Sequence, residues 1–229
     1  MPDKSYVSPK TYDNTDLSPI ELGNNLFIPI VEKFCYLGTI LSRNCKDTDD
    51  IENRIKRASS AFGALRKSLF TNPSISEKVR GAVYSTLILP ILLYGSECWC
   101  LSENLFHELR LFHHACARSM CRVNLSHTFM YRISTRDLLD RLGLQSIDTY
   151  IVKRSLSWAG HVARMDFSRI PRKMLSSWVC SKRNLGCPDF TYGRGLFKML
   201  KLAGLSRNDW FELAQDRLAW SLLIKNLKI

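Results

Sequence analysis

The chain has 229 residues, of which 45% are hydrophobic and 24% charged, and this ordinary balance excludes a protein that is disordered throughout. Its formal net charge of +12 and pI near 9.5 favour an anionic partner, nucleic acid above all, over a membrane surface. The excess is local, because residues 51–100 carry seven basic and three acidic side chains and residues 151–200 carry ten and two. Localised basic surfaces are therefore expected, although a solvated lysine and arginine face gives the same pattern.

The first 20 residues are polar and lack the apolar stretch of a signal peptide. The longest apolar run, Leu87–Tyr94, is too short to cross a bilayer and contains Pro90. We therefore expect an intracellular protein, nuclear or cytoplasmic and not secreted, with reduced cysteines and no membrane partner. The sequence does not indicate an oligomeric state.

At the N-terminal end, the polar residues 1–18 predict a flexible leader. Gly23-Asn24-Asn25 is a turn signal, and Phe34–Leu41 is rich in β-branched and aromatic residues. These features predict a small sheet of two or three strands across residues 19–42.

From Asp49 the apolar spacing changes to that of an amphipathic helix, with a stripe formed by Ile51, Ile55, Ala58, Phe62, Leu65 and Leu69. A capping box of Asp49 and Glu52 is predicted to start this helix, and Asn72-Pro73 to end it. Ser74 and Glu77 predict a second helix that reaches about Gly95 and is kinked at Pro90. A third helix is predicted from Ser102 to about Val123.

The remaining residues predict a second helical lobe over 134–229. Its expected helices are Ser134–Gly143, Ser146–Met165 and one capped by Ser206 and Asp209, with a glycine-containing loop at 180–195. Residues 19–123 are predicted to form a first domain, with Asn124–Ile133 as the hinge. The expected fold is thus mainly α: a helical bundle and a second helical lobe, preceded by a small N-terminal β-hairpin or sheet.

Six segments together resemble a known family. They are residues 34–38 (FCYLG), 55–65 (IKRASSAFGAL), 92–99 (LLYGSECW), 112–118 (FHHACAR), 158–165 (WAGHVARM) and 213–220 (LAQDRLAW). In this order, across residues 20–224, they resemble the C-terminal part of reverse transcriptases of non-LTR (LINE-type) retrotransposons. One departure is Gly186-Cys187-Pro188, where relatives often have an arginine between the glycine and the proline.

In that family the hairpin around Y-L-G looks like the primer grip, which holds the end of the growing strand, and the helices after it form the thumb. The resemblance therefore implies contacts with nucleic acid by Phe34, Tyr36, Leu37 and Gly38. Gly38 would let the backbone approach a sugar or phosphate closely. The alternative is an ordinary core strand that ends in a glycine.

A thumb binds a duplex through its backbone, so its contacts are cationic and independent of sequence. The candidates are Arg54, Lys56, Arg57 and Lys67, expected off the apolar stripe, with Lys78 and Arg80 at the start of the next helix. His161 and Arg164 lie three apart and suggest a second basic ridge, beside a Trp158 that is either a core residue or a base-stacking platform. A solvated helix surface remains the alternative for each cation.

Polymerisation requires paired aspartates in a palm that hold magnesium ions. No such motif precedes Phe34, and Asp49-Asp50 is expected to cap a helix, so the sequence assigns no catalytic residue and no cofactor. Magnesium would enter only with a palm from a longer product. The cluster His107, His113, His114, Cys116 and Cys121 falls within one predicted helix, so no metal ligand is assigned.

The sequence thus predicts a reverse-transcriptase-derived fragment, truncated before the hairpin, that binds an RNA–DNA hybrid or duplex without polymerising by itself. One alternative is part of an active reverse transcriptase whose palm is encoded upstream. Another is a co-opted helical module that binds proteins, and a third is a chain without a stable function.

Overall fold

The computed structural model describes residues 20–21, 27–28, 31–42, 46–176, 192–207 and 209–229. It is mainly helical with small antiparallel strand pairs near the N-terminus, which confirms the predicted fold class. The predicted leader, the turn at residues 23–25 and most of the predicted loop at 180–195 lie outside the described residues.

The strands form two separate two-stranded sheets, where a single sheet of two or three strands was expected. Strand β1 (Ile20–Glu21) pairs with β2 (Phe27–Ile28), and β3 (Lys33–Tyr36) pairs with β4 (Thr39–Ser42). In the second pair, Phe34 lies opposite Leu41 and Tyr36 opposite Thr39. This β3–β4 hairpin carries the F-x-Y-L-G segment.

Helix α1 (Thr48–Leu65) follows the hairpin and continues as the π-helical η2 (Arg66–Phe70). Its apolar stripe is buried at Ile51, Ala58 and Phe62, as the spacing predicts. The predicted capping box of Asp49 and Glu52 is wrong. Asp47 occupies the N-cap position without a side-chain capping bond, because the carboxylates of this turn bind other parts of the chain, as described below.

The second predicted helix is α2 (Glu77–Val83), continued by the π-helical η3 (Tyr84–Ile88) and by α3 (Leu89–Leu92). Its cap is Ser76, which accepts a hydrogen bond from the amide of Val79, and not Ser74. The change to π geometry comes just before Pro90, which has no amide hydrogen to donate.

Further along, α4 (Glu103–Met120) and α7 (Ile147–Ala163) start at the predicted caps Ser102 and Ser146. Helix α6 (Thr135–Leu142) has the predicted Ser134–Asp137 capping box and ends at Gly143, which has a left-handed φ of +69°. The predicted hinge at 124–133 contains the short helix α5 (Leu125–Met130).

The C-terminal elements are α8 (Ile170–Ser176), α9 (Tyr192–Leu202), α10 (Trp210–Leu213) and α11 (Arg217–Asn226). The last predicted helix is therefore two helices, and residues 192–195 of the predicted loop belong to α9. None of the helices in the described residues combines the length and apolar character that a membrane span requires.

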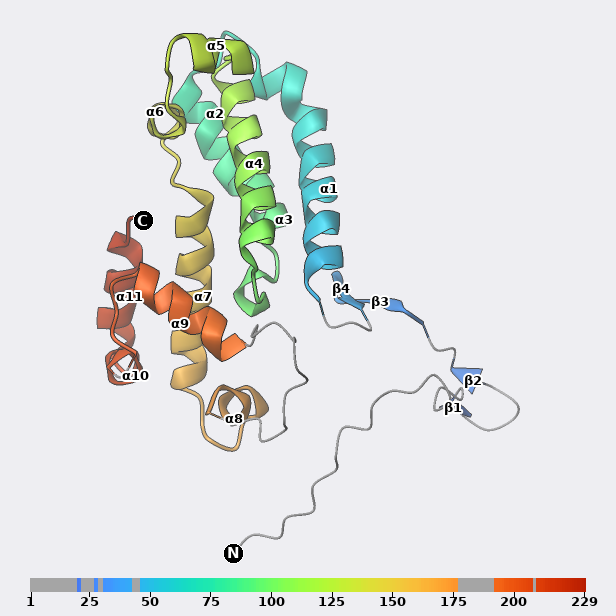
Figure 1. Cartoon of the computed structure of the whole chain (residues 1–229), viewed down its shortest axis with the longest axis vertical. Helices are drawn as coiled ribbons and strands as arrows, with labels where there is room; N and C mark the ends of the chain where they lie inside the picture. Colours follow the sequence, from blue (N-terminus) through green and yellow to red (C-terminus); the bar gives the residue numbers. More distant parts are fainter. Residues whose placement is uncertain (1–19, 22–26, 29–30, 43–45, 177–191, 208) are drawn as a thin grey trace, which may run out of the picture.

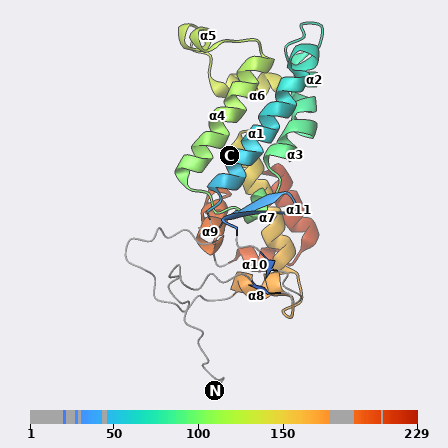
Figure 2. The same ribbon diagram turned by 90° about the vertical axis from the view of Figure 1, so that its right-hand side faces the viewer.

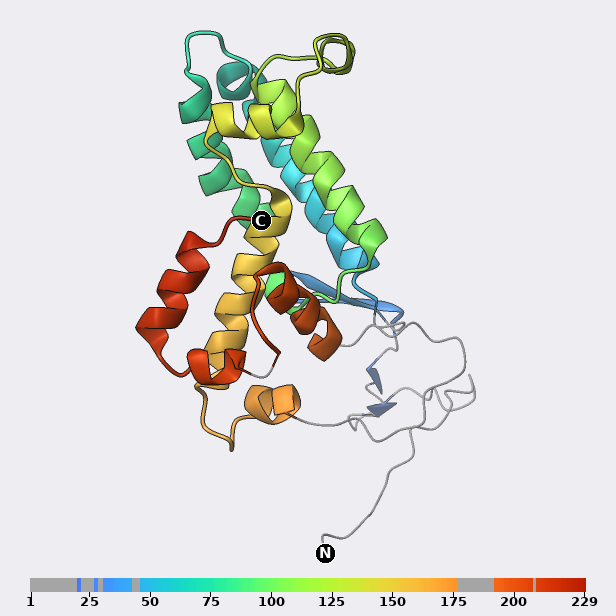
Figure 3. The same cartoon turned by 60° about the vertical axis from the view of Figure 1, so that its left-hand side comes forward.

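Helices α1, α2 and α4 form an elongated bundle, with α5 and α6 across one end and the hairpin at the other (Figure 1). Helix α7 continues past the bundle, and α9, α10 and α11 surround its far half (Figures 1 and 3). The quarter-turned view places α5 and α8 at opposite ends of the long axis (Figure 2). One buried apolar cluster joins residues from Ile51 to Trp220, so the division into two domains stays a prediction.

Candidate nucleic-acid interface

The tip of the β3–β4 hairpin is a two-residue turn made by Leu37 and Gly38. Both have positive φ, +49° and +84°, as a tight turn between antiparallel strands requires. A Cβ atom added to Gly38 would lie 3.9 Å from Nη2 of Arg54, an ordinary contact. The glycine at this position is therefore explained by the turn conformation, where the sequence had suggested close approach to a ligand.

Arg54 of α1 anchors this turn from inside the protein. Its side chain is only 3% exposed, and its Nη2 donates to the carbonyl oxygen of Gly38 at 2.5 Å and to the hydroxyl oxygen Oγ1 of Thr39 at 3.4 Å. Its Cζ atom also lies 4.5 Å from the ring centroid of Tyr94. The sequence had suggested Arg54 as a phosphate contact beside the apolar stripe, whereas the structure buries it under the hairpin and leaves it no exposed surface for a phosphate.

Asp50 completes this buried polar cluster. It is 2% exposed, and Oδ1 accepts a hydrogen bond from the amide of Ile40 at 3.0 Å, while Oδ2 accepts one from Nε1 of Trp99 at 3.1 Å. Oδ1 also lies 3.6 Å from Nε of Arg54. Asp50 therefore joins three segments of the chain and does not serve as the helix cap that the sequence suggested.

Tyr94 and Asp47 add further links between these segments. The hydroxyl of Tyr94 donates to the carbonyl of Leu37 at 3.1 Å, and Oδ2 of Asp47 accepts from the amide of Cys100 at 2.7 Å. Arg154 of α7 donates to the carbonyl of Leu93 at 3.1 Å. The hairpin, the first turns of α1 and the segment 92–99, far apart in the sequence, therefore meet.

The outward face of the hairpin is apolar and exposed. Phe34, Tyr36 and Leu37 are 56%, 57% and 75% exposed, and Leu41, which pairs with Phe34, is also exposed. Burial of such side chains would contribute about 25 cal/mol per Å² of apolar surface. This surface is therefore available to a partner, and the expectation of an ordinary core strand does not describe it.

The opposite side of α1 presents cations with small residues between them. Lys56, Arg57 and Lys67 are exposed, and within the described part of the chain the structure shows no ion pair for any of them. The exposed residues between them include Ser60, Gly63 and Ala64. We call this surface, which continues from α1 into η2 at Lys67, the outer face of α1.

The two candidates on α2 differ in the same way as those on α1. Lys78 is exposed. Arg80 is 3% exposed, and its guanidinium donates to the carbonyls of Asn72 (2.9 Å), Ile75 (2.6 Å) and Met120. Arg80 therefore holds the 71–76 loop against the end of α4, and the structure excludes it from the exposed basic surface.

Within the cluster of histidines and cysteines at 107–121, His113 and Cys116 are buried, and His113 is hydrogen-bonded to residues outside the cluster. Nε2 of His113 lies 3.1 Å from the carbonyl oxygen of Gln145, which only accepts, so Nε2 carries the proton and Nδ1 accepts from Tyr84 at 3.0 Å. Burial lowers the pKa of His113 to about 4 and raises that of Cys116 to about 12. In the residues that the structure describes, no three His, Cys, Asp or Glu side chains are placed to hold a metal ion.

His161 lies in the last turn of α7, and Arg164 is the C-cap residue that follows this helix. His161 is exposed, whereas Arg164 is half-buried and donates to the carbonyl of Ala214 at 2.6 Å. Trp158, expected in the core, is half-buried, with its ring centroid 5.6 Å from that of His161. These residues line hollows that are separate from the outer face of α1.

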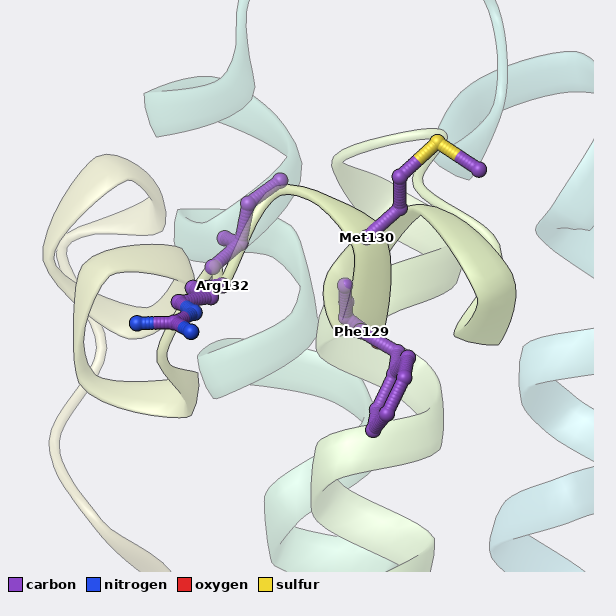
Figure 4. Close-up of a pocket in the computed structure, with 5 residues that line it drawn as sticks. Phe129, Met130 and Arg132 are labelled. Atoms are coloured by element: carbon purple, nitrogen blue, oxygen red, sulfur yellow. The ribbon is translucent and has the colours of Figure 1, made fainter.

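A further hollow of about 640 Å³ lies beside α5, lined by residues that include Phe129, Met130 and Arg132. The three labelled side chains point in different directions, so they do not converge on a ligand (Figure 4). All of its lining residues come from the single segment 128–133. The hollow is a concavity of an exposed loop, and we assign it no site.

Sequence reasoning missed three residues of the hairpin support: Asp50, Tyr94 and Trp99. Tyr94 and Trp99 lie within the family-like segment 92–99, and this resemblance was the signal that could have found them. Nothing in the sequence indicates that Asp50 contacts the hairpin, because it lies on the same turn as two exposed or half-exposed acidic residues.

Comparison with known proteins gives one informative similarity. The chain is 25% identical over 202 residues to an uncharacterized transposon-derived protein of Caenorhabditis elegans, a match that covers 85% of this chain and 71% of that protein. No protein-family model matches the chain, and no solved structure matches it. The similarity supports a transposon-related origin.

Proposed function

We propose that this transposon-related chain is the nucleic-acid-holding part of a non-LTR retrotransposon reverse transcriptase. In this proposal the β3–β4 hairpin and the outer face of α1 bind the backbone of a primer–template duplex, an RNA–DNA hybrid or a related duplex. One observation carries the proposal. The buried side of α1 fixes the hairpin through Asp50 and Arg54, and its other side exposes cations that form no ion pair with any residue that the structure describes.

The outer face has dimensions that suit a duplex backbone. Lys56 and Lys67 are 11 positions apart, or about 16 Å along a helix. Over that length a duplex carries roughly nine phosphate charges, at one per about 1.7 Å of its axis. The small side chains of Ser60 and Ala64, and the absence of one at Gly63, let the phosphates approach the helix between the long cationic side chains.

The hairpin would add contacts to the sugar and base edges through Phe34, Tyr36 and Leu37. Its tip is held at the carbonyls of Leu37 and Gly38 by Tyr94 and Arg54, so binding would not have to order a free loop. The proposal assigns binding alone to this chain. Catalysis would require a palm and its magnesium ions from a longer product.

The exposed hairpin face supports a second candidate, a surface that binds another protein. Phe34, Tyr36 and Leu41 form an apolar patch of the kind that is often covered in an assembly. The protein bound at this surface would be either a palm domain or an unrelated partner. In either case the cations of α1 would not be needed for the interaction.

Binding of the full chain to a fluorescent 16-base-pair RNA–DNA hybrid, roughly a turn and a half of duplex, tests the proposal. The affinity should fall as salt increases, and Lys56→Gln, Arg57→Gln and Lys67→Gln together should weaken it. Absence of hybrid binding at low salt, or binding that ignores salt, would contradict the proposal. The second candidate predicts a different pattern. If the double variant Phe34→Ser, Leu41→Ser loses hybrid binding and the triple variant of Lys56, Arg57 and Lys67 keeps it, an apolar interface is favoured.

A further inference from the structure

The groove between α7 and α11 is a half-enclosed hollow of about 460 Å³. Ser157 and His161 line it from one face of α7, Arg164 lines it from the C-cap of that helix, and Arg217 and Ser221 line it from α11. Helices α7 and α11 lie side by side in both views that separate them (Figures 1 and 3). The hollow therefore depends on contacts between two helices and does not belong to a single loop.

The floor of the groove is fixed by Trp220. Its Nε1 donates to the carbonyl of Leu156 at 3.0 Å. A Cβ atom on Gly160 would lie 2.1 Å from the same nitrogen, so only glycine allows the indole to pack here. The walls above this floor are held apart by packing, and a ligand would not have to open them.

The walls of the groove are basic. They present two arginines and a histidine, and none of the residues that line the hollow is acidic. Arg164 is oriented by its bond to the carbonyl of Ala214, and Arg217 is exposed at the first position of α11. The nearby Asp216 accepts from the amides of Leu218 and Ala219, as a helix cap does. Guanidinium groups in this arrangement are suited to a phosphate.

An adjoining hollow of about 380 Å³ shares Ser157 and His161 with the groove. It is lined by Trp158, Arg154 and Glu97, and the last two lie 3.9 Å apart. The carboxylate of Glu97 disfavours a phosphate at this end, whereas the half-buried indole offers a flat apolar surface. The two hollows thus differ in the ligand chemistry that each accepts.

We propose that the paired hollows bind one nucleotide of a single-stranded nucleic acid, with its phosphate between Arg164 and Arg217 and its base against Trp158. A duplex is too wide to enter a hollow of about 460 Å³, and its bases are already stacked on one another. Base–aromatic stacking and backbone cations are the usual means of binding single strands. The choice of nucleic acid as ligand rests on the proposed function, but the site is separate from the outer face of α1.

The test uses the full chain, a labelled 12-nucleotide oligothymidylate and the blunt RNA–DNA hybrid, measured by fluorescence anisotropy at low salt. Loss of one charge-assisted phosphate contact in Arg217→Gln should weaken oligothymidylate binding about tenfold. Lys201→Gln removes the same charge from an exposed position of α9 and should change the affinity less than twofold. Trp158→Phe should retain binding, and Trp158→Leu should weaken it about tenfold.

The two proposals fail in different ways. Oligothymidylate binding that is absent, or equally weakened by Arg217→Gln and Lys201→Gln, would overturn the groove proposal. So would an Arg217→Gln protein whose hybrid affinity falls as much as its single-strand affinity. Loss of hybrid binding alone in the triple variant of the outer face of α1 would support two separate sites. Absence of hybrid binding in the unchanged chain would overturn the duplex proposal. The groove proposal would then be judged by the oligothymidylate measurements alone.

Discussion

The two sides of α1 use cations in opposite ways. Arg54 and Lys56 are two positions apart, yet Arg54 is buried against the hairpin and Lys56 is exposed. The difference follows from what each side faces. The hairpin tip presents the carbonyl oxygen of Gly38 and the hydroxyl of Thr39 to Arg54, whereas Lys56 is exposed in the part of the chain that the structure describes. A cationic residue in a family-like segment is therefore evidence of binding only after its internal acceptors have been found.

The same contrast is repeated on α2, between the buried Arg80 and the exposed Lys78. Each buried arginine donates to several oxygens that are fixed in space, three backbone carbonyls in the case of Arg80. A guanidinium has five donors in a rigid plane and is suited to this role, whereas a lysine would satisfy fewer acceptors. Arginine chemistry here supports the fold, and the exposed cations are the ones left for a ligand.

The largest expected effect comes from breaking the buried side of α1. Asp50→Ala should lower the free energy of unfolding by about 3–5 kcal/mol, because it leaves the guanidinium of Arg54 buried without its counter-ion. It also removes the acceptor of Ile40 and Trp99. Urea denaturation measures the change. The control Glu52→Ala, on the exposed side of the same turn, should change the value by less than about 0.5 kcal/mol, and equal effects of both would refute the contrast.

A second large effect should appear with pH at His113. Its pKa is lowered to about 4 by burial, so between pH 6.5 and pH 4 the unfolded chain binds a proton that the folded chain does not. Stability is therefore complete above pH 6.5 and is lost as the pH falls toward 4, by about 3 kcal/mol. Urea denaturation across this range gives the slope.

His113→Gln provides the reference for that measurement, because glutamine offers a donor and an acceptor but does not titrate. The variant should be less stable at pH 7 and should lack most of the pH dependence between 6.5 and 4. An unchanged pH dependence would show that other groups are responsible for it.

Two glycines lie in contrasting environments, one at a packed helix crossing and one on the open surface. A Cβ atom on Gly81 of α2 would lie 2.0 Å from the carbonyl oxygen of Leu142, whereas one on Gly63 of α1 would meet nothing within 4 Å. Gly81→Ala should therefore destabilise the protein by about 1–3 kcal/mol. Gly63→Ala should stabilise it by about 0.5–1 kcal/mol, through helix propensity alone. Thermal denaturation distinguishes the two, and a destabilising Gly63→Ala would show that the outer face of α1 is covered.

An effect of similar size to that of Gly63→Ala is expected at the hairpin tip. Leu37 has a φ of +49° and is largely exposed, so its conformation is unfavourable and its side chain contributes little packing. Leu37→Asn should raise the free energy of unfolding by about 1 kcal/mol, since asparagine tolerates the left-handed region. Chemical denaturation would detect it. If the same variant binds the hybrid more weakly, then Leu37 contributes to binding at a cost in stability.

Local sequence rules predicted those elements whose signals are local. Ser102, Ser134 and Ser146 start helices as expected, because each cap binds an amide only three residues away. The capping box at Asp49 failed for the opposite reason. Asp47 and Asp50 bind Cys100, Trp99 and Ile40, partners up to 53 positions distant that no periodicity reveals.

The residues of the candidate site likewise differ in whether local spacing predicts their exposure. The exposure of Lys56 and Lys67 agrees with their expected position away from the apolar stripe, since a helix face can be read from its spacing. The burial of Arg54 and Arg80 depends on carbonyl groups of other segments and could not be predicted. Neither could the groove beside His161, because it requires α11 to pack against α7 through Trp220 and Gly160.

The most direct test of the central claim is the salt dependence of hybrid binding. We expect the slope of log Kd against log salt to fall by about 0.9 for each phosphate contact removed, and so by nearly 3 in Lys56→Gln, Arg57→Gln and Lys67→Gln combined. The control triple Lys201→Gln, Lys225→Gln and Lys228→Gln removes the same charge from exposed C-terminal positions and should leave the slope within about 0.5 of the original. Equal slopes for the two triple variants would contradict the assignment of duplex binding to the outer face of α1.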